Sequence, residues 1–262
     1  MKNIRNLNKT FLGIIFSRRV IKSMEGSLSE RPVALITGAA QRIGAAVTCR
    51  FHASGYKTII HFNRSQLEAE ELHSKLNDLR SESAFLVQGD LNDDKTLDRI
   101  AKQVTKIGRL DVLINNAGHA LRAPSVDYPM DDWDRLIELN LTAPFLLSRG
   151  LAPSMLQRGA GKVIFTASLW SFLGGRSVPA YTVTKSGIAG MIRALSNEWA
   201  PQGVQVNGIA PGYIDTDLTR PAINDPEMGP AFLSRIPAGR WGEPRDVAGA
   251  ALFLASHHSE YI

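Results

Sequence analysis

Short apolar runs alternate with amphipathic stretches along nearly all of this chain, and that alternation restricts its fold more than any other feature. The apolar runs lie at residues 33–37, 57–62, 84–88, 110–114, 163–167 and 204–209, and each has the length of a buried β-strand. Patterns typical of helices lie at about 42–54, 65–80, 93–107, 130–149 and 180–200. We therefore expect an α/β fold, a Rossmann-type doubly wound parallel sheet in a single domain over 31–262. Residues 210–240 are rich in Pro and Gly and are predicted to form a long loop over a ligand site.

The positive charge of the chain is concentrated at its N-terminus. The 262 residues carry a formal net charge of +5, but residues 1–23 alone hold six basic and no acidic side chains. The rest of the chain holds 24 basic and 25 acidic side chains, which gives little support for nucleic-acid binding. We interpret 1–30 as a basic extension, with three alternatives: a disordered tail, residues upstream of a true start at Met24, or a mitochondrial targeting segment.

Two further features narrow the class of protein. No apolar run approaches the roughly 20 residues that a membrane-spanning helix needs, so we expect no membrane partner. Cys49 is the only cysteine, which excludes an internal disulfide and a multi-cysteine metal site, and we predict no metal centre. These constraints favour a cytoplasmic protein that acts on a small molecule.

A glycine-containing turn joins the first predicted strand to the first predicted helix. Glycine lets the backbone turn tightly and approach a pyrophosphate, while the start of the following helix presents unpaired N–H groups. The context of strand, turn and helix therefore predicts a dinucleotide site. The residues of this turn that we expect to bind the dinucleotide are Gly38, Gln41, Arg42, Ile43 and Gly44.

The end of the second predicted strand bears on which dinucleotide is bound. A fold selective for NAD often carries an acidic residue there, for the hydroxyls of the adenosine ribose. This chain instead has His61, Asn63, Arg64 and Ser65. Arg64 and Ser65, joined by Arg42, could hold a 2′-phosphate through charge-assisted hydrogen bonds. The sequence therefore predicts a preference for NADP(H), with NAD(H) as the alternative cofactor.

One turn of the 180–200 helix carries a candidate acid–base pair. Tyr181 and Lys185 are four residues apart, so their side chains share one face of the helix. An ammonium beside a phenol favours the phenolate, and we expect Lys185 to lower the pKa of Tyr181 from about 10. Ser168 follows the predicted strand 163–167 and could hydrogen-bond the same substrate oxygen. These residues predict proton exchange with a carbonyl or an alcohol.

In this order and spacing, the residues resemble the short-chain dehydrogenase/reductase family over about 31–262. The resemblance extends to the segments 115–118 and 211–216 and to Asn140. It implies that Asn140, Ser168, Tyr181 and Lys185 are catalytic, with Asn140 anchoring a water in a proton relay through Lys185. It also implies further cofactor contacts, which are Asp90 and Leu91 at the adenine, Asn116, Ala117 and Gly118 beside the ribose, and Tyr181, Lys185, Pro211, Gly212, Ile214 and Thr216 at the nicotinamide end.

The two halves of the chain resemble different branches of that family. Segments 38–44 and 61–65 are similar to pteridine reductases, which use NADPH, but those enzymes carry Asp where this chain has Ser168. Segments 168–175, 197–199, 210–217 and 236–244 are similar to gluconate and deoxy-gluconate dehydrogenases. Because the second half builds the substrate end, we expect interconversion of a hydroxyl and a carbonyl on a small polar substrate. A sugar acid is one candidate, and Arg176 or Arg220 could meet its carboxylate. A pteridine-reductase-like enzyme is the alternative.

The C-terminal end departs from the family pattern. Family members continue after the last helix into another strand, whereas this chain stops at Ile262. The expected sheet therefore lacks an edge strand. That end also contributes to the family's tetramer interface, so the homo-oligomer that the resemblance implies, a dimer or tetramer, depends on it. A truncated, non-catalytic dinucleotide-binding protein is the second alternative.

Overall fold

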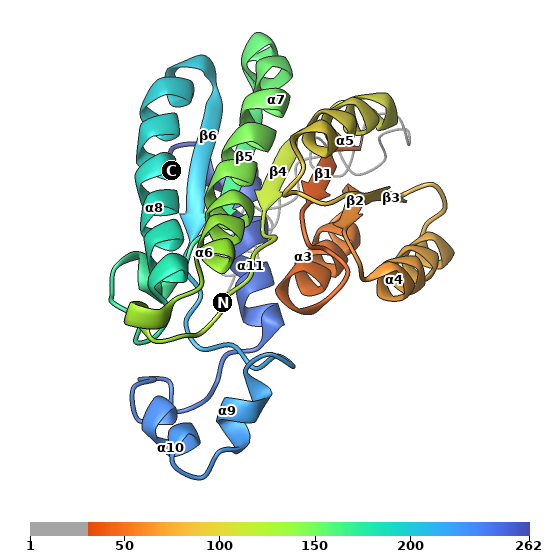
Figure 1. Cartoon of the computed structure of the whole chain (residues 1–262). Helices are drawn as coiled ribbons and strands as arrows, with labels where there is room; N and C mark the ends of the chain where they lie inside the picture. Colours follow the sequence, from red (N-terminus) through yellow and green to blue (C-terminus); the bar gives the residue numbers. More distant parts are fainter. Residues whose placement is uncertain (1–30) are drawn as a thin grey trace, which may run out of the picture. The chain divides into compact units, whose positions relative to one another are not determined.

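The computed structural model describes residues 31–262, of which Pro32–Ile262 form one compact unit (Figure 1). The predicted extension 1–30, with its three interpretations, lies outside the described residues. One sheet of six parallel strands has the order β3-β2-β1-β4-β5-β6. Its strands are β1 (Val33–Ile36), β2 (Lys57–Phe62), β3 (Ala84–Gln88), β4 (Val112–Asn115), β5 (Gly161–Thr166) and β6 (Val204–Ile209). The predicted doubly wound sheet is confirmed.

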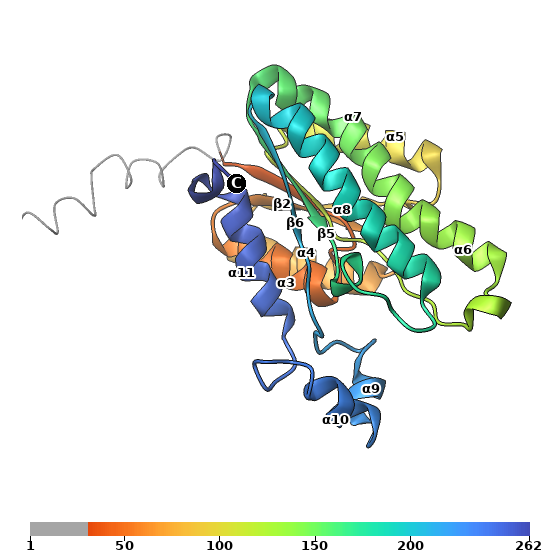
Figure 2. The same cartoon turned by 90° about the vertical axis from the view of Figure 1, so that its left-hand side faces the viewer.

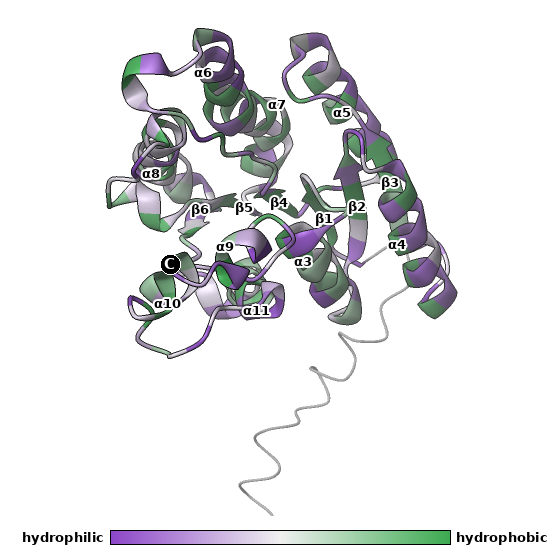
Figure 3. Cartoon of the chain, turned by 60° about the horizontal axis from the view of Figure 1, so that its bottom comes forward, coloured by the Kyte–Doolittle hydropathy of each residue, from purple (hydrophilic) through white to green (hydrophobic). Residues whose placement is uncertain are grey.

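Helices cover both faces of this sheet (Figures 2 and 3). One layer consists of α3 (Arg42–Ala53), α4 (Gln66–Leu79) and α11 (Pro244–Ala255). The other consists of α5 (Asp94–Ile107), α6 (Met130–Ile137), α7 (Ala143–Arg158) and α8 (Pro179–Trp199). None of the helices in residues 31–262 is long and apolar enough to cross a bilayer.

Strand β1 shows why both faces are buried. Val33 and Leu35 pack into the core beneath α5, α7 and α8, while Ala34 and Ile36 pack into the core beneath α3, α4 and α11. Successive side chains of a strand point to opposite faces, so a strand covered on both sides is apolar throughout. All four residues are almost fully buried.

Three predicted elements differ from the structure. The helix expected at 130–149 is α6, a π-helical turn η3 (Glu138–Thr142) and then α7, which continues to Arg158. The strand expected at 110–114 begins at Val112. The loop expected at 210–240 contains two short helices, α9 (Arg220–Asn224) and α10 (Met228–Leu233). No strand follows α11 in the described part of the chain, so β6 is an edge of the sheet.

Candidate active site

The turn between β1 and α3 requires glycine at two positions. Gly38 has φ +60°, and a Cβ there would lie 3.0 Å from the Cα of Ala117. At Gly44 a Cβ would lie 2.1 Å from the carbonyl oxygen of Gly38, which no side chain can tolerate. The turn therefore brings bare backbone to the switch point between β1 and β4, where folds of this class bind ligands. Arg42 in the same turn also has a positive φ, +54°.

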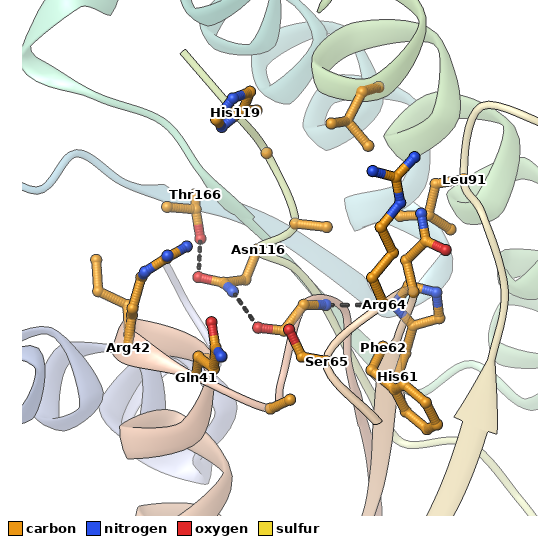
Figure 4. Close-up of a pocket in the computed structure, with 18 of the residues that line it drawn as sticks. Gln41, Arg42, His61, Phe62, Arg64, Ser65, Leu91, Asn116, His119 and Thr166 are labelled. Atoms are coloured by element: carbon orange, nitrogen blue, oxygen red, sulfur yellow. Dashed lines mark hydrogen bonds between the residues drawn. The ribbon is translucent and has the colours of Figure 1, made fainter. Parts of the chain in front are cut away.

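His61 holds this turn in place. Its Nδ1, in the ring labelled in Figure 4, accepts a hydrogen bond from the Gly38 N–H at 3.2 Å. Its Nε2 lies 3.2 Å from the carbonyl oxygen of Gly89. The neutral ring, protonated at Nε2, satisfies both contacts. His61 is buried, and burial lowers its pKa to about 4. The predicted cofactor residue His61 thus lines the site and also supports its glycine turn.

Hydrogen bonds tie the end of β4 to the end of β1. The hydroxyl of Thr37 accepts the N–H groups of Asn116 and Ala117, each at 2.9 Å. The Asn116 amide donates to the carbonyl of Thr37 at 3.0 Å, and its oxygen accepts from Thr166 at 3.5 Å (Figure 4). These contacts fix the floor of the site at the carboxyl ends of the strands.

A pocket of about 400 Å³ lies above this floor. Most of the predicted cofactor residues line it: Gly38, Gln41, Arg42, Ile43, Gly44, His61, Asn63, Arg64, Ser65, Asp90, Leu91, Asn116, Ala117, Gly118, Tyr181, Lys185 and Thr216. Pro211, Gly212 and Ile214 are not part of its lining. Sequence reasoning missed Ala40, Phe62, Asn92, His119, Ala120, Arg135, Leu139, Thr166 and Leu218. All but one of these lie within two residues of a predicted site residue in the chain, which was an available signal. Arg135 is the exception, since only its helix places it there.

In the described part of the chain, the pocket residues Arg64 and Ser65 have side chains that are free to meet a ligand. Within residues 31–262, neither side chain makes a hydrogen bond or ion pair. Burial acts to raise the pKa of Asp90, but hydrogen bonds from Asn92 and Asn63 and the charge of Arg64 outweigh it and hold that pKa below its usual range. The pocket end therefore combines a free guanidinium and hydroxyl with an ionised carboxylate.

Arg42 has a different partner from the one expected. Its guanidinium makes a two-pronged ion pair with Asp217, with Nε–Oδ1 and Nη2–Oδ2 distances of 2.5 and 2.6 Å. Asp217 lies between two pocket residues, Thr216 and Leu218, in the segment that follows β6. The pair thus joins the glycine turn to that segment, and Arg42 lines the same pocket as Arg64.

The predicted catalytic residues Tyr181 and Lys185 lie side by side, with Ser168 near Tyr181. The Ser168 hydroxyl accepts the N–H of Trp170 at 3.3 Å and lies near enough to Tyr181 to act on its pKa. The Lys185 Nζ is buried, lies 5.6 Å from the centre of the Tyr181 ring and donates to the carbonyl of Thr166 at 2.6 Å. Burial lowers the pKa of Lys185 to about 8. Burial raises the pKa of Tyr181, partly opposed by the Ser168 hydrogen bond. The expected lowering by the ammonium is therefore wrong for this state, because desolvation dominates.

Asn140 sits in the π-helical turn η3, a distortion that is frequent at functional sites. Its Oδ1 accepts the N–H of His119 at 2.9 Å, and its Nδ2 donates to the carbonyl of His119 at 2.8 Å. A Cβ on Gly118 would lie 3.0 Å from the Asn140 Oδ1 and 3.7 Å from the Lys185 Nζ. Asn140 and Lys185 thus flank the same glycine.

Comparison with known proteins identifies the family. The sequence pattern of the family described as short chain dehydrogenase matches residues 32–227. The chain belongs to this family. The predicted family is thereby confirmed, and as a short-chain dehydrogenase the protein is an oxidoreductase.

Several short-chain dehydrogenases with sugar-acid names are similar to this one. The 2-dehydro-3-deoxy-D-gluconate 5-dehydrogenase of Pseudoalteromonas atlantica is 42% identical over 235 residues, which cover 89% of this chain and 92% of that protein. The enzyme of the same name from Bacillus subtilis is 38% identical, with 87% and 89% covered. A gluconate 5-dehydrogenase from Burkholderia cenocepacia, solved with NADP and tartrate, has a TM-score of 0.83 at 32% identity, with 90% and 91% covered.

The two arginines suggested for a substrate carboxylate do not line the pocket of this dehydrogenase. Arg220 pairs with Asp215 at 3.2 Å, and Arg176 is exposed. Neither position gives structural support to the suggested contact.

Proposed function

We propose that this short-chain dehydrogenase uses NADP(H) to interconvert a hydroxyl and a carbonyl group on a sugar acid. The observation that carries the proposal is the pairing of Tyr181 with the buried Lys185, whose Nζ lies 5.6 Å from the centre of the Tyr181 ring, in a pocket that Arg64 and Ser65 also line. The names of the relatives from Pseudoalteromonas and Bacillus, and the NADP bound to the Burkholderia enzyme, support the same substrate class and cofactor.

The residues present fit NADP(H). A side chain at Gly44 would clash with the Gly38 carbonyl, so this turn admits only bare backbone, and the N-terminus of α3 follows it. Arg64 offers a guanidinium and Ser65 a hydroxyl, neither of them paired with another described residue, and these are the donors that a 2′-phosphate needs. When bound, the nicotinamide supplies or accepts the hydride.

Side chains of the protein transfer the proton and bind the substrate oxygen. Ser168 donates a hydrogen bond to that oxygen and orients it, and Tyr181 gives the proton to a forming alcohol or takes it from a reacting one. Lys185, whose pKa burial lowers to about 8, lies with its Nζ 5.6 Å from the centre of the Tyr181 ring and assists the transfer. Asn140 holds the backbone at His119 beside them.

Replacing Tyr181 by Phe tests the proposal. Purified enzyme is assayed with NADPH against keto sugar acids, simple ketones and pterins. We expect turnover of a keto sugar acid, and a fall of at least about 100-fold in kcat for Tyr181→Phe with NADPH affinity nearly unchanged, because only the proton donor is lost. Tyr261→Phe, at a fully exposed tyrosine, is the matched control and leaves turnover as it was.

Two results would redirect the proposal. Turnover of pterins alone favours the pteridine-reductase alternative. Binding of NADPH with no turnover of any substrate favours the non-catalytic alternative. The proposal also includes a homo-oligomer working in the cytoplasm, which the family resemblance supports. Light scattering of the purified chain tests the oligomer, and fractionation of cells that express it tests the location.

A further inference from the structure

The end of the pocket proposed for adenosine contains both hydrogen-bond donors and a hydrogen-bond acceptor. Arg64 and Ser65 present donors, which suit a phosphate. Gln41 also lines the pocket, but its Nε2 donates to the Glu68 Oε1 at 2.5 Å (Figure 4 shows Gln41). Because the Gln41 amide nitrogen donates to the Glu68 carboxylate, the Gln41 carbonyl oxygen remains available to accept a hydrogen bond from a ligand.

A carbonyl oxygen distinguishes between the two dinucleotides. The 2′-hydroxyl of the adenosine in NAD(H) can donate a hydrogen bond to it. The 2′-phosphate of NADP(H) is negatively charged near neutral pH and presents acceptor oxygens, which a carbonyl repels. The bond to Glu68 fixes the Gln41 amide and uses one of its two N–H donors, so it leaves the carbonyl oxygen for the hydroxyl and one donor fewer for a phosphate.

Glu68 also acts through its own charge. It lies in the first turn of α4, three residues after Ser65, and its carboxylate is exposed. A negative charge near the 2′ position weakens the binding of a phosphate and leaves a hydroxyl nearly unaffected. Both effects oppose the preference that Arg64 provides.

We infer that Glu68 is a specificity-determining residue: by holding Gln41 and by its charge, it limits the preference for NADP(H) and keeps NAD(H) usable. The inference rests on the proposed function, because it concerns the selectivity of that same cofactor site. Within residues 31–262, Glu68 does not line the pocket and reaches it through its bond to Gln41, so it is a positioning residue and not a catalytic one.

The same helix offers a matched control. Glu70 accepts a hydrogen bond from the Gln66 Nε2 at 2.7 Å, which repeats the Gln–Glu contact of Gln41 with Glu68. Glu70 is also exposed, and neither Gln66 nor Glu70 lines the pocket. Glu70→Gln therefore makes the same change of charge on the same helix without a link to the site.

The experiment compares Glu68→Gln and Glu70→Gln in the full-length enzyme. The readouts are the Kd values for NADPH and NADH and the ratio of kcat/KM with the two cofactors. We expect Glu68→Gln to raise the NADPH-to-NADH ratio about three- to tenfold at low ionic strength, through Kd and KM with little change in kcat, and less at high salt. Glu70→Gln changes the ratio by less than about 1.5-fold, by the same reasoning.

A second variant separates the two effects of Glu68. In a Gln41→Ala background, Glu68→Gln retains only its effect on charge, so its effect on NADH binding disappears and the two substitutions are not additive. Equal ratios for Glu68→Gln and Glu70→Gln, with both variants folded by circular dichroism, would overturn the inference while the proposed function stands. If the wild-type chain binds neither dinucleotide, the proposed function fails and this inference fails with it.

Discussion

At the scale of single residues, His61 makes the cofactor-free fold sensitive to acid. Its folded-state pKa is about 4 because the ring is buried, whereas an unfolded histidine titrates near 6.5. Above pH 6.5 the His61 ring is neutral in both the folded and the unfolded protein, so its titration does not change the free energy of unfolding. Below that pH the unfolded state binds the proton first, so stability falls until about pH 4, by up to roughly 3 kcal/mol.

Urea unfolding at several pH values measures this loss. Between pH 6 and 4.5 the wild type is expected to lose up to about 1.4 kcal/mol per pH unit more than His61→Gln, which cannot take up this proton. His258→Gln, at an exposed histidine, keeps the wild-type slope. Identical slopes for wild type and His61→Gln would show that the ring is not held neutral in the folded state.

The sequence predicted single residues where spacing alone brings them together. Tyr181 and Lys185 are one helical turn apart, so their convergence followed from helix geometry. The direction of the Tyr181 pKa did not follow, because it depends on how much water the surrounding side chains exclude. The hydrogen bond between Gln41 and Glu68 could not be predicted from the sequence either, since it depends on how α3 and α4 lie against each other.

At the scale of elements, the ion pair Arg42–Asp217 connects the start of α3 to the segment after β6. We expect Asp217→Asn and Arg42→Gln each to increase amide hydrogen exchange in residues 213–224, because either change removes the same contact. Both side chains are partly exposed, with 36% and 60% accessible, so the effect is below about 1 kcal/mol and high salt reproduces it.

The pair Asp215–Arg220 provides the control, since it lies wholly within the segment after β6. Asp215→Asn leaves α3 and that segment joined, and we expect exchange at the glycine turn to stay at the wild-type rate. If the double variant Arg42→Gln/Asp217→Asn exchanges much faster than either single variant, the two side chains act separately and the connection is wrong.

Elements with a strong pattern were predicted closely. The bounds of β2, β3 and β6 match the apolar runs, because parallel strands buried on both faces are apolar at every position. The π-helical turn at Glu138–Thr142 has no recognisable sequence pattern, since its composition is that of the helices on either side. Helices α9 and α10 are only five and six residues long, too short for a periodic pattern to stand out among the prolines.

At the scale of the whole molecule, the pocket collects residues from the ends of β1, β2, β3, β4 and β5 and from the segment after β6. A bound dinucleotide therefore touches connections distributed across the sheet, and these contacts are lost together when the fold unfolds. Ligand binding should then appear as global stability. At 100 times its Kd, NADPH is expected to raise the free energy of unfolding by about 2.7 kcal/mol. For a domain of this size that corresponds to a Tm increase of roughly 5–10 °C.

Thermal unfolding of the wild type and of Tyr181→Phe, each with and without NADPH, tests this expectation. Because Tyr181 is assigned to the proton and not to holding the fold, both proteins should gain the same Tm increase while only the wild type turns over substrate. If Tyr181→Phe loses both the Tm increase with NADPH and its turnover, Tyr181 mainly binds the dinucleotide. An increase in the wild type with no turnover of any substrate would mean that this sheet binds a dinucleotide without catalysing its reaction.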